Sequence, residues 1–102
     1  MDGQFLEYLI QPVDGGWFHY PGELHDCSIF QPFNYPSTVL EGREVCCIQV
    51  ANCEIYFSNE IVGVQVTVET DEISLEAINS IIKSVANHIA AVTGQPTVVH
   101  LL

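Results

Sequence analysis

The segments IVGVQVTVET (residues 61–70) and SLEAINSIIKSVANHIAAVTG (residues 74–94) decide the fold of this chain. In the first segment, valines at every second position alternate with Gln65, Thr67 and Glu69, which is the period of a strand with one buried face. In the second, branched apolar residues recur at spacings of three and four, which is the period of an amphipathic helix. Those helical positions are Ile78, Ile81, Ile82, Val85, Ile89 and Val92. We therefore predict a half-buried strand followed by one long helix.

Both ends of this helix carry the signals that start and stop helices. Ser74 or Thr70 is the predicted N-cap, because a side-chain oxygen there can accept a bond from a free amide. Gly94 supplies the C-terminal stop, and Pro96 prevents the helix from continuing. Residues 97–102 form a short final strand. The order of strand, helix and strand predicts a crossover within one sheet.

Outward from this segment, the first half of the chain consists of short β-rich runs separated by turn residues. We predict strands over residues 5–10, 17–20, 27–33, 44–50 and 53–57, with a turn at Ser58-Asn59-Glu60. The pattern leaves open whether Ala51-Asn52 is a turn or a bulge in one long strand. The fold class is α+β: a mainly antiparallel sheet of about five or six strands, with one long C-terminal helix packed on one face and a short final strand. Residues 1–102 form a single domain, as is usual at this length.

The charge balance excludes two classes of partner. The chain has 2 basic and 13 acidic residues and a formal net charge of -11, too few cations to bind nucleic-acid phosphates or anionic lipid headgroups. Every acid lies at or before Glu76, so the β-rich part carries the acidic surface. We predict a non-enzymatic binding protein that presents this face to a basic protein partner. Immunity proteins and DNA mimics are similar to it in charge and size alone.

Composition also predicts self-association, with a dimer favoured. The chain is 48% hydrophobic and only 15% charged, whereas an average domain is about 25% charged, so part of its apolar surface should be covered by another copy. The predicted outer side of the helix carries a single lysine among small or uncharged side chains. The predicted interface residues there are Ser80, Lys83, Ser84, Asn87 and Ala91. The alternative is a merely uncharged, exposed helix face.

The aromatic segment 17–35 is the source of a second functional prediction, a pocket for a small molecule in a homo-oligomer. Rings with polar tips line ligand pockets, although they also cover cores. The candidate binding residues are Trp17, His19, Tyr20, His25, Tyr35 and Arg43. Arg43, the only arginine, could anchor an anionic ligand. The alternative for Arg43 is an ion pair with Glu41 or Glu44 in a hairpin turn.

The cysteines suggest a third function, an enzyme, which we rank below both binding functions. Cys27 beside His19 or His25 could form a thiolate nucleophile, although no catalytic signature surrounds it. The sequence has neither a signal peptide nor a membrane-spanning run, so we expect a cytoplasmic protein. In that compartment all four cysteines, Cys27, Cys46, Cys47 and Cys53, should be reduced. Zinc-ligand spacing is missing, and we predict no metal ion and no cofactor.

Overall fold

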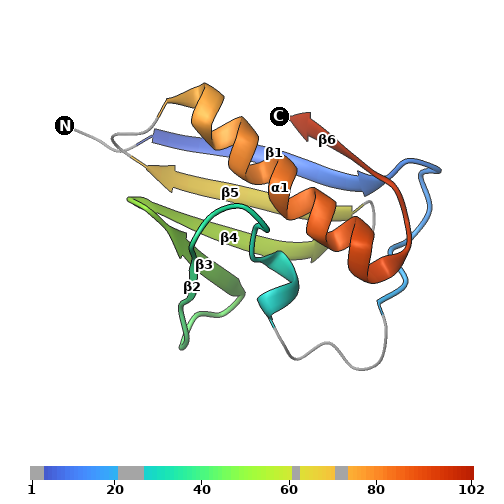
Figure 1. Cartoon of the computed structure of the whole chain (residues 1–102), viewed down its shortest axis with the longest axis horizontal. Helices are drawn as coiled ribbons and strands as arrows, with labels where there is room; N and C mark the ends of the chain where they lie inside the picture. The colour runs from blue at the N-terminus through green and yellow to red at the C-terminus, as the bar shows by residue number, and fades with distance from the viewer. Residues whose placement is uncertain (1–3, 21–26, 61–62, 71–73) are drawn as a thin grey trace.

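The computed structural model describes residues 4–20, 27–60, 63–70 and 74–102, which form an antiparallel sheet with one helix across one face (Figure 1). The elements in chain order are β1 (Gln4–Pro12), the 3-10 helix η1 (Cys27–Phe30), β2 (Thr38–Val39), β3 (Cys46–Val50), β4 (Cys53–Glu60), β5 (Gly63–Thr70), α1 (Leu75–Thr93) and β6 (Thr97–Leu101). The predicted α+β class is confirmed.

The sheet has 6 strands in the order β2-β3-β4-β5-β1-β6. The first strand of the chain, β1, lies between β5 and β6 and is antiparallel to both. It follows that β5 and β6 are parallel to each other and are connected by α1, which crosses the sheet between them (Figure 1). The predicted strand, helix and strand therefore do share one sheet, with β1 inserted between the two strands.

The core lies between α1 and the sheet face beneath it. Val64, Val66 and Val68 of β5 are each 0% exposed, so the predicted alternation of this strand is confirmed. They pack with the apolar side of α1, including Ile78, Ile81, Ile82, Val85 and Ile89. A polar contact joins the two layers, because the buried hydroxyl of Tyr8 donates to Asn79 Oδ1 at 2.6 Å. Burial of this hydroxyl raises the pKa of Tyr8.

The two ends of α1 follow the sequence signals. Ser74 Oγ accepts a hydrogen bond from the amide of Ala77 at 3.1 Å, so Ser74 is the N-cap. The alternative cap, Thr70, is instead buried at the end of β5. Gly94 has a φ of 73° and donates its amide to the carbonyl of Ala90, a left-handed C-cap that glycine adopts without strain. Within the described ranges, no helix combines the length and apolar character needed to cross a membrane.

Two predicted strands in the first half are not strands. Residues 27–33 begin instead with η1, where the amide of Gln31 bonds to the carbonyl of Ser28 at 3.0 Å. This tight turn places the apolar side chains of Ile29 and Phe30 in the core, which the extended chain of a strand could not do for two neighbours. Residues 17–20 form no strand either; the side chain of Gln95 instead bonds the amide of His19 and the carbonyl of Trp17.

One hairpin connection was left open by the sequence, and another differs from the prediction. Ala51-Asn52 is a turn between β3 and β4, and Ala51 has a positive φ of 53°. Ser58-Asn59-Glu60 was predicted as a turn but is the end of β4, where Glu60 pairs with Gly63 of β5. Residues 61–62, at the start of the predicted strand, lie outside the described residues.

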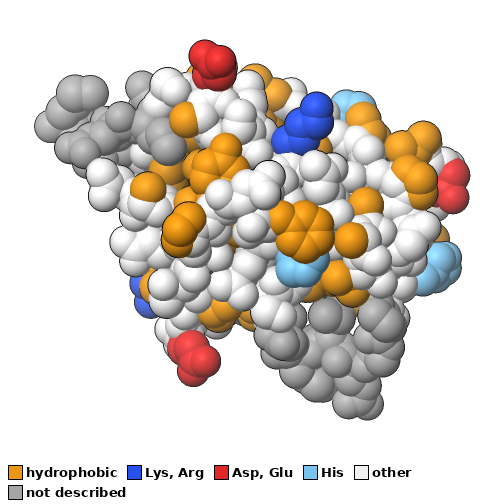
Figure 2. All heavy atoms as spheres, in the orientation of Figure 1, with side chains coloured by type: hydrophobic (Ala, Val, Ile, Leu, Met, Phe, Trp, Pro, Cys, Tyr) orange, Lys and Arg blue, Asp and Glu red, His pale blue; other side chains and the backbone are white. Residues whose placement is uncertain are grey.

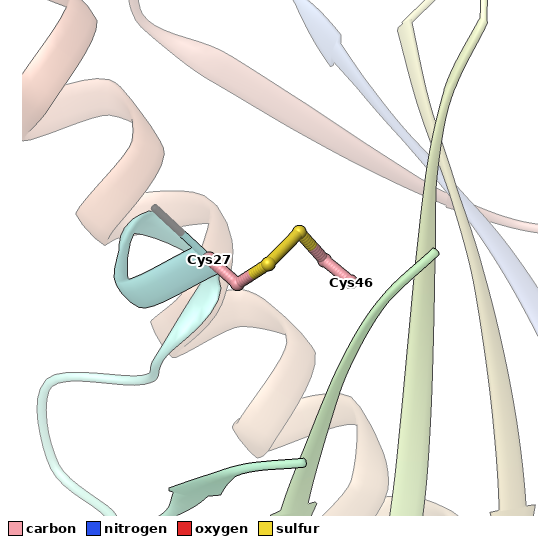
Figure 3. Close-up of a disulfide and its surroundings, with 2 residues drawn as sticks. All are labelled: Cys27 and Cys46. Atoms are coloured by element: carbon pink, nitrogen blue, oxygen red, sulfur yellow. A yellow bond between two sulfur atoms is a disulfide. The ribbon is translucent and has the colours of Figure 1, made fainter. Parts of the chain in front are cut away.

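A disulfide joins Cys27 of η1 to Cys46 of β3 (Figure 3). The expectation of four reduced thiols is therefore wrong for these two residues. The fold places their Cα atoms 5.6 Å apart, within the range that a disulfide spans. Cys47 and Cys53 are free and buried.

Candidate binding surface

The sheet has a second face, turned away from α1, which we call the outer face. Alternate residues of a strand point to opposite faces, and the residues of β1, β4 and β5 between the core positions therefore point outward. These outward residues are Phe5, Glu7 and Leu9 of β1, Glu54, Tyr56 and Ser58 of β4, and Gln65, Thr67 and Glu69 of β5. All of them are exposed or partly exposed, so no described element covers this part of the sheet.

Two carboxylates and an aromatic ring form one row across the outer face. Glu54 of β4 pairs with Glu69 of β5, and Glu69 pairs in turn with Phe5 of β1. Phe5 is 66% exposed, a large apolar surface left in water. Side chains directly opposite each other on neighbouring strands are close enough to interact. The row therefore places negative charge directly beside an exposed ring.

Arg43 lies at one end of this row. It was expected either to anchor a ligand or to pair with Glu41 or Glu44, but its Nη2 contacts Glu54 Oε1 at 3.2 Å. This hydrogen bond raises the pKa of Arg43. The partner of Arg43 is therefore a residue of β4, which pairs with Gln49 of β3, and not one of its neighbours in the sequence. Among the described residues, Glu69 forms no ion pair, and it is the uncompensated carboxylate of the row.

A buried thiol lies next to Arg43 and Glu54. Cys47 of β3 pairs with Tyr56 of β4 and is 0% exposed, although its strand position points to the outer face. Desolvation is the main cause that raises the pKa of the Cys47 thiol, and the negative charge of Glu54 raises it further. Desolvation also raises the pKa of Tyr56. The Cys47 thiol is therefore protonated at neutral pH and unsuited to act as a nucleophile.

The sequence did not single out this cluster of Arg43, Cys47, Glu54 and Tyr56. The signal that could have found it is the alternation of side chains on either side of Ala51-Asn52. Once that pair is taken as a tight turn, Cys47 and Tyr56 must face the same side of the hairpin.

Of the predicted binding residues that the structure describes, only Trp17 and Tyr20 come together in one site. With Phe18, Asn59, Glu60 and Gly63, they line a hollow of about 250 Å³. The hydroxyl of Tyr20 donates to Asn59 Oδ1 at 2.9 Å. Burial raises the pKa of Tyr20 to about 12. Trp17 is 61% exposed and offers its ring to a ligand in this hollow.

The other predicted binding residues lie elsewhere. His19 is exposed, and its backbone amide bonds to Gln95 Oε1 at 2.6 Å. Tyr35 is partly buried against the core, as the alternative of a core cover implied. Arg43 belongs to the outer face, and His25 lies outside the described residues. The aromatic segment is therefore divided between the core and the surface.

The outer side of α1 holds most of the predicted oligomer residues. Ser80, Lys83, Asn87 and Ala91 are exposed there. Ser84 is only 5% exposed, and its Oγ accepts from the amide of Asn34 at 3.3 Å, so it does not belong to the exposed row. Figure 2 shows this side of the molecule, where acidic side chains appear only at the periphery.

A groove of about 460 Å³ runs between α1 and β6. Lys83 and Asn87 line it from the helix, and Val99 and Leu101 line it from the strand. Tyr8 and Asn79 also reach it. Two of the predicted oligomer residues thus share a groove with the edge strand of the sheet.

Catalysis by a Cys27 thiolate does not agree with the structure, because its sulfur is bonded to that of Cys46. Across the described ranges, no group of three or more His, Cys, Asp and Glu side chains is arranged to hold a metal ion. Comparison of the chain with known proteins finds no matching family model, no similar curated protein and no similar solved structure.

Proposed function

We propose that this chain is a non-enzymatic binding protein whose outer face binds a basic protein partner. The observation that carries the proposal is the row of Glu54, Glu69 and Phe5. Protein interfaces centre on a few anchors surrounded by polar groups, and this row offers an aromatic anchor with carboxylates beside it.

Electrostatics favour a cationic group at this position. Like charges directly opposite each other in a sheet destabilise it, and Arg43 contacts only the Glu54 end of the row. A lysine or arginine of the partner placed between Glu69 and Phe5 would offset the repulsion. It would also be attracted to the face of the aromatic ring.

The charge of the whole chain supports the same partner class. A net charge of -11 attracts a basic protein from a distance and raises its association rate, and salt weakens this attraction. We therefore expect fast binding that falls steeply with ionic strength.

An NMR titration with an arginine-rich peptide as probe tests this proposal at low salt. We expect the amide shifts to concentrate at Phe5, Glu54 and Glu69, and to shrink in the Glu69→Gln and Phe5→Ala variants. Glu76→Gln is the matched control, because it removes the same charge from the start of α1. Shifts centred on Glu76, or spread evenly over all carboxylates, would contradict a site on the outer face.

A small-molecule pocket in a homo-oligomer is the second candidate function, and the hollow beside Trp17 and Tyr20 is the observation that favours it. A ligand there would stack on Trp17. In a thermal-shift screen, a compound that binds there should raise the melting temperature of the native chain but not that of the Trp17→Ala variant. A library with no stabilising compound would count against this function.

The compartment is also part of the proposal. A cytoplasmic location was expected from the sequence, but a disulfide such as Cys27–Cys46 persists mainly in oxidising compartments. The bridge therefore favours an oxidising site of action over the cytoplasm. Thiol trapping of the protein in its native cells distinguishes the two: a free Cys27 thiol would restore the cytoplasmic assignment.

A further inference from the structure

Within the part of the chain that the structure describes, the backbone of β6 is unpaired along one side. β6 is an edge strand, with β1 on its inner side. The amide of Leu102 donates to the carbonyl of Glu7 at 2.8 Å, and the amide of Val13 donates to the carbonyl of Pro96 at 2.9 Å. In an antiparallel ladder the bonded pairs alternate, so Val98 and His100 also bond inward. The backbone N–H and C=O groups of Thr97, Val99 and Leu101 therefore point away from β1.

This edge lacks the features that usually prevent strands from pairing. Natural edge strands are shortened or carry lysine or proline, and β2 at the opposite edge has only 2 residues. β6 has 5 residues, TVVHL, without lysine, glycine or proline. Val98 is 37% exposed and Leu101 is 51% exposed. The edge thus offers both free hydrogen-bonding groups and apolar side chains.

The distribution of charge favours a second copy of this chain as the partner of the β6 edge. Two copies with a net charge of -11 each repel one another, and contact is least costly where carboxylate side chains are absent. Residues 77–102 contain no Asp or Glu, and this segment includes most of α1 and all of β6. A basic partner would find no carboxylate side chain on β6, whereas a second copy would meet a surface as neutral as its own.

We propose that β6 pairs antiparallel with β6 of a second copy, about a twofold axis at Val99. Val99 then lies opposite Val99 of the partner subunit, and Thr97 lies opposite Leu101 of the partner subunit. By symmetry, Leu101 also lies opposite Thr97 of the partner subunit. Three residue pairs therefore form, and each pair exchanges two N–H···O bonds. The two sheets become one continuous sheet, and the outer faces remain open.

The groove between α1 and β6 lies beside this axis. Thr97, Val99 and Leu101 pair with residues of β1 that are buried on the α1 side. Their side chains therefore stand on this side of the sheet, where they line the groove. Pairing of the strands places the grooves of the two copies next to each other. Lys83 and Asn87, which line the groove from α1, then flank the dimer contact.

Hydrogen exchange of individual amides tests the pairing on the native chain. The amides of Val98 and His100 bond within the chain, so they should exchange slowly at every protein concentration. The amides of Thr97, Val99 and Leu101 should be protected only at concentrations where sedimentation shows a dimer, and exchange quickly on dilution. A dimer in which these three amides exchange quickly would use another surface and would overturn the proposal.

A pair of substitutions at one exposed position gives a second test. Leu101→Pro removes an outward amide without removing a bond to β1, whereas Leu101→Ala shortens the same side chain and keeps the amide. By sedimentation, Leu101→Pro should weaken dimerisation by about tenfold or more relative to Leu101→Ala, because two symmetric inter-chain bonds are lost. Circular dichroism checks that both variants are folded.

A third variant, Val99→Pro, removes the outward amides at the axis itself. A native chain that remains a monomer at millimolar concentration would refute the proposal. The proposal would also be refuted if Leu101→Pro and Val99→Pro were both folded and both dimerised as tightly as the native chain. Neither result would affect the proposal for the outer face, which does not depend on β6.

Discussion

Glu54 of β4 and Glu69 of β5 are direct cross-strand partners, so two residues of like charge face each other on the outer face of the sheet. Such a pair lowers the stability of a sheet by about 0.2–1 kcal/mol. Arg43 contacts Glu54 at 3.2 Å and offsets part of the repulsion. The arrangement costs stability, and a cation bound beside Glu69, as proposed above, would offset the rest of the repulsion.

The first prediction concerns the stability of the Glu69→Gln variant. Removing one charge from the pair should raise the free energy of unfolding by about 0.2–1 kcal/mol at low salt. Urea denaturation at neutral pH measures this change, and added salt should reduce it.

Glu76→Gln is the control for this prediction, because it also removes one carboxylate. Glu76 lies in the first turn of α1, where a negative charge stabilises the helix by about 0.3–1 kcal/mol. This variant should therefore be less stable than the native chain. Equal effects of the two substitutions would mean that net charge, and not the Glu54–Glu69 pair, sets the stability.

The elements that the sequence predicted correctly depend on local periodicity. The alternation of Val64, Val66 and Val68 and the helical spacing from Ile78 to Ile89 report burial directly. The caps Ser74 and Gly94 satisfy the helix ends within a few residues of chain. No distant residue is needed for any of these signals, so one sequence was enough.

The features that could not be predicted depend on register and on tertiary contact. A shift of one residue in pairing turns every side chain of a strand to the other face, and the turn at Ala51 was left open. Without that turn, the contact of Arg43 with Glu54 could not be placed. The bridge from Cys27 to Cys46 required η1 to lie against β3, which no local pattern encodes.

The second prediction concerns the Cys27–Cys46 disulfide. The two residues are separated by 19 positions, and closing a loop of this size stabilises a fold by about 3 kcal/mol through the unfolded state. Reduction should therefore lower the urea midpoint clearly. Cys27→Ser with Cys46→Ser should be as stable as the reduced native chain.

Thiol counting checks the same bridge independently. The denatured chain without reductant should react at Cys47 and Cys53 alone, and all four cysteines should react after reduction. Four reactive thiols before reduction would contradict the bridge. In the folded chain, Cys47 and Cys53 should react slowly because both are buried.

The third prediction is that Gly63 tolerates no side chain. Its φ is 147°, and a Cβ there would lie 2.3 Å from the carbonyl oxygen of Ile10 in the adjacent strand. Gly63→Ala should lower the free energy of unfolding by about 2–4 kcal/mol, because backbone at the centre of the sheet must move. Thermal or urea unfolding measures the loss.

Gly15→Ala separates this close approach from backbone strain alone. Gly15 has a φ of 75°, and a Cβ there meets nothing within 4 Å. The left-handed conformation alone should cost about 1–2 kcal/mol. If Gly15→Ala were as damaging as Gly63→Ala, the contact with Ile10 would not be the cause.

The fourth prediction concerns the alkaline stability that Tyr20 gives. Burial raises the pKa of Tyr20 to about 12 from the ordinary value of 10.0. The folded chain therefore keeps a proton that the unfolded chain releases above its lower pKa. The contribution of this group to stability is complete below pH 10.0 and is lost as the pH rises through about 12.

Tyr20→Phe isolates this contribution, because it keeps the ring and removes the hydroxyl that donates to Asn59. Urea unfolding should show that the native chain loses stability more steeply than Tyr20→Phe between pH 10.0 and about 12. Tyr8 and Tyr56 are present in both chains, so their ionisation cancels in the difference. Parallel pH profiles would mean that the Tyr20 hydroxyl ionises as readily in the folded chain as in the unfolded one, and that the hollow beside Trp17 is open to water at that hydroxyl.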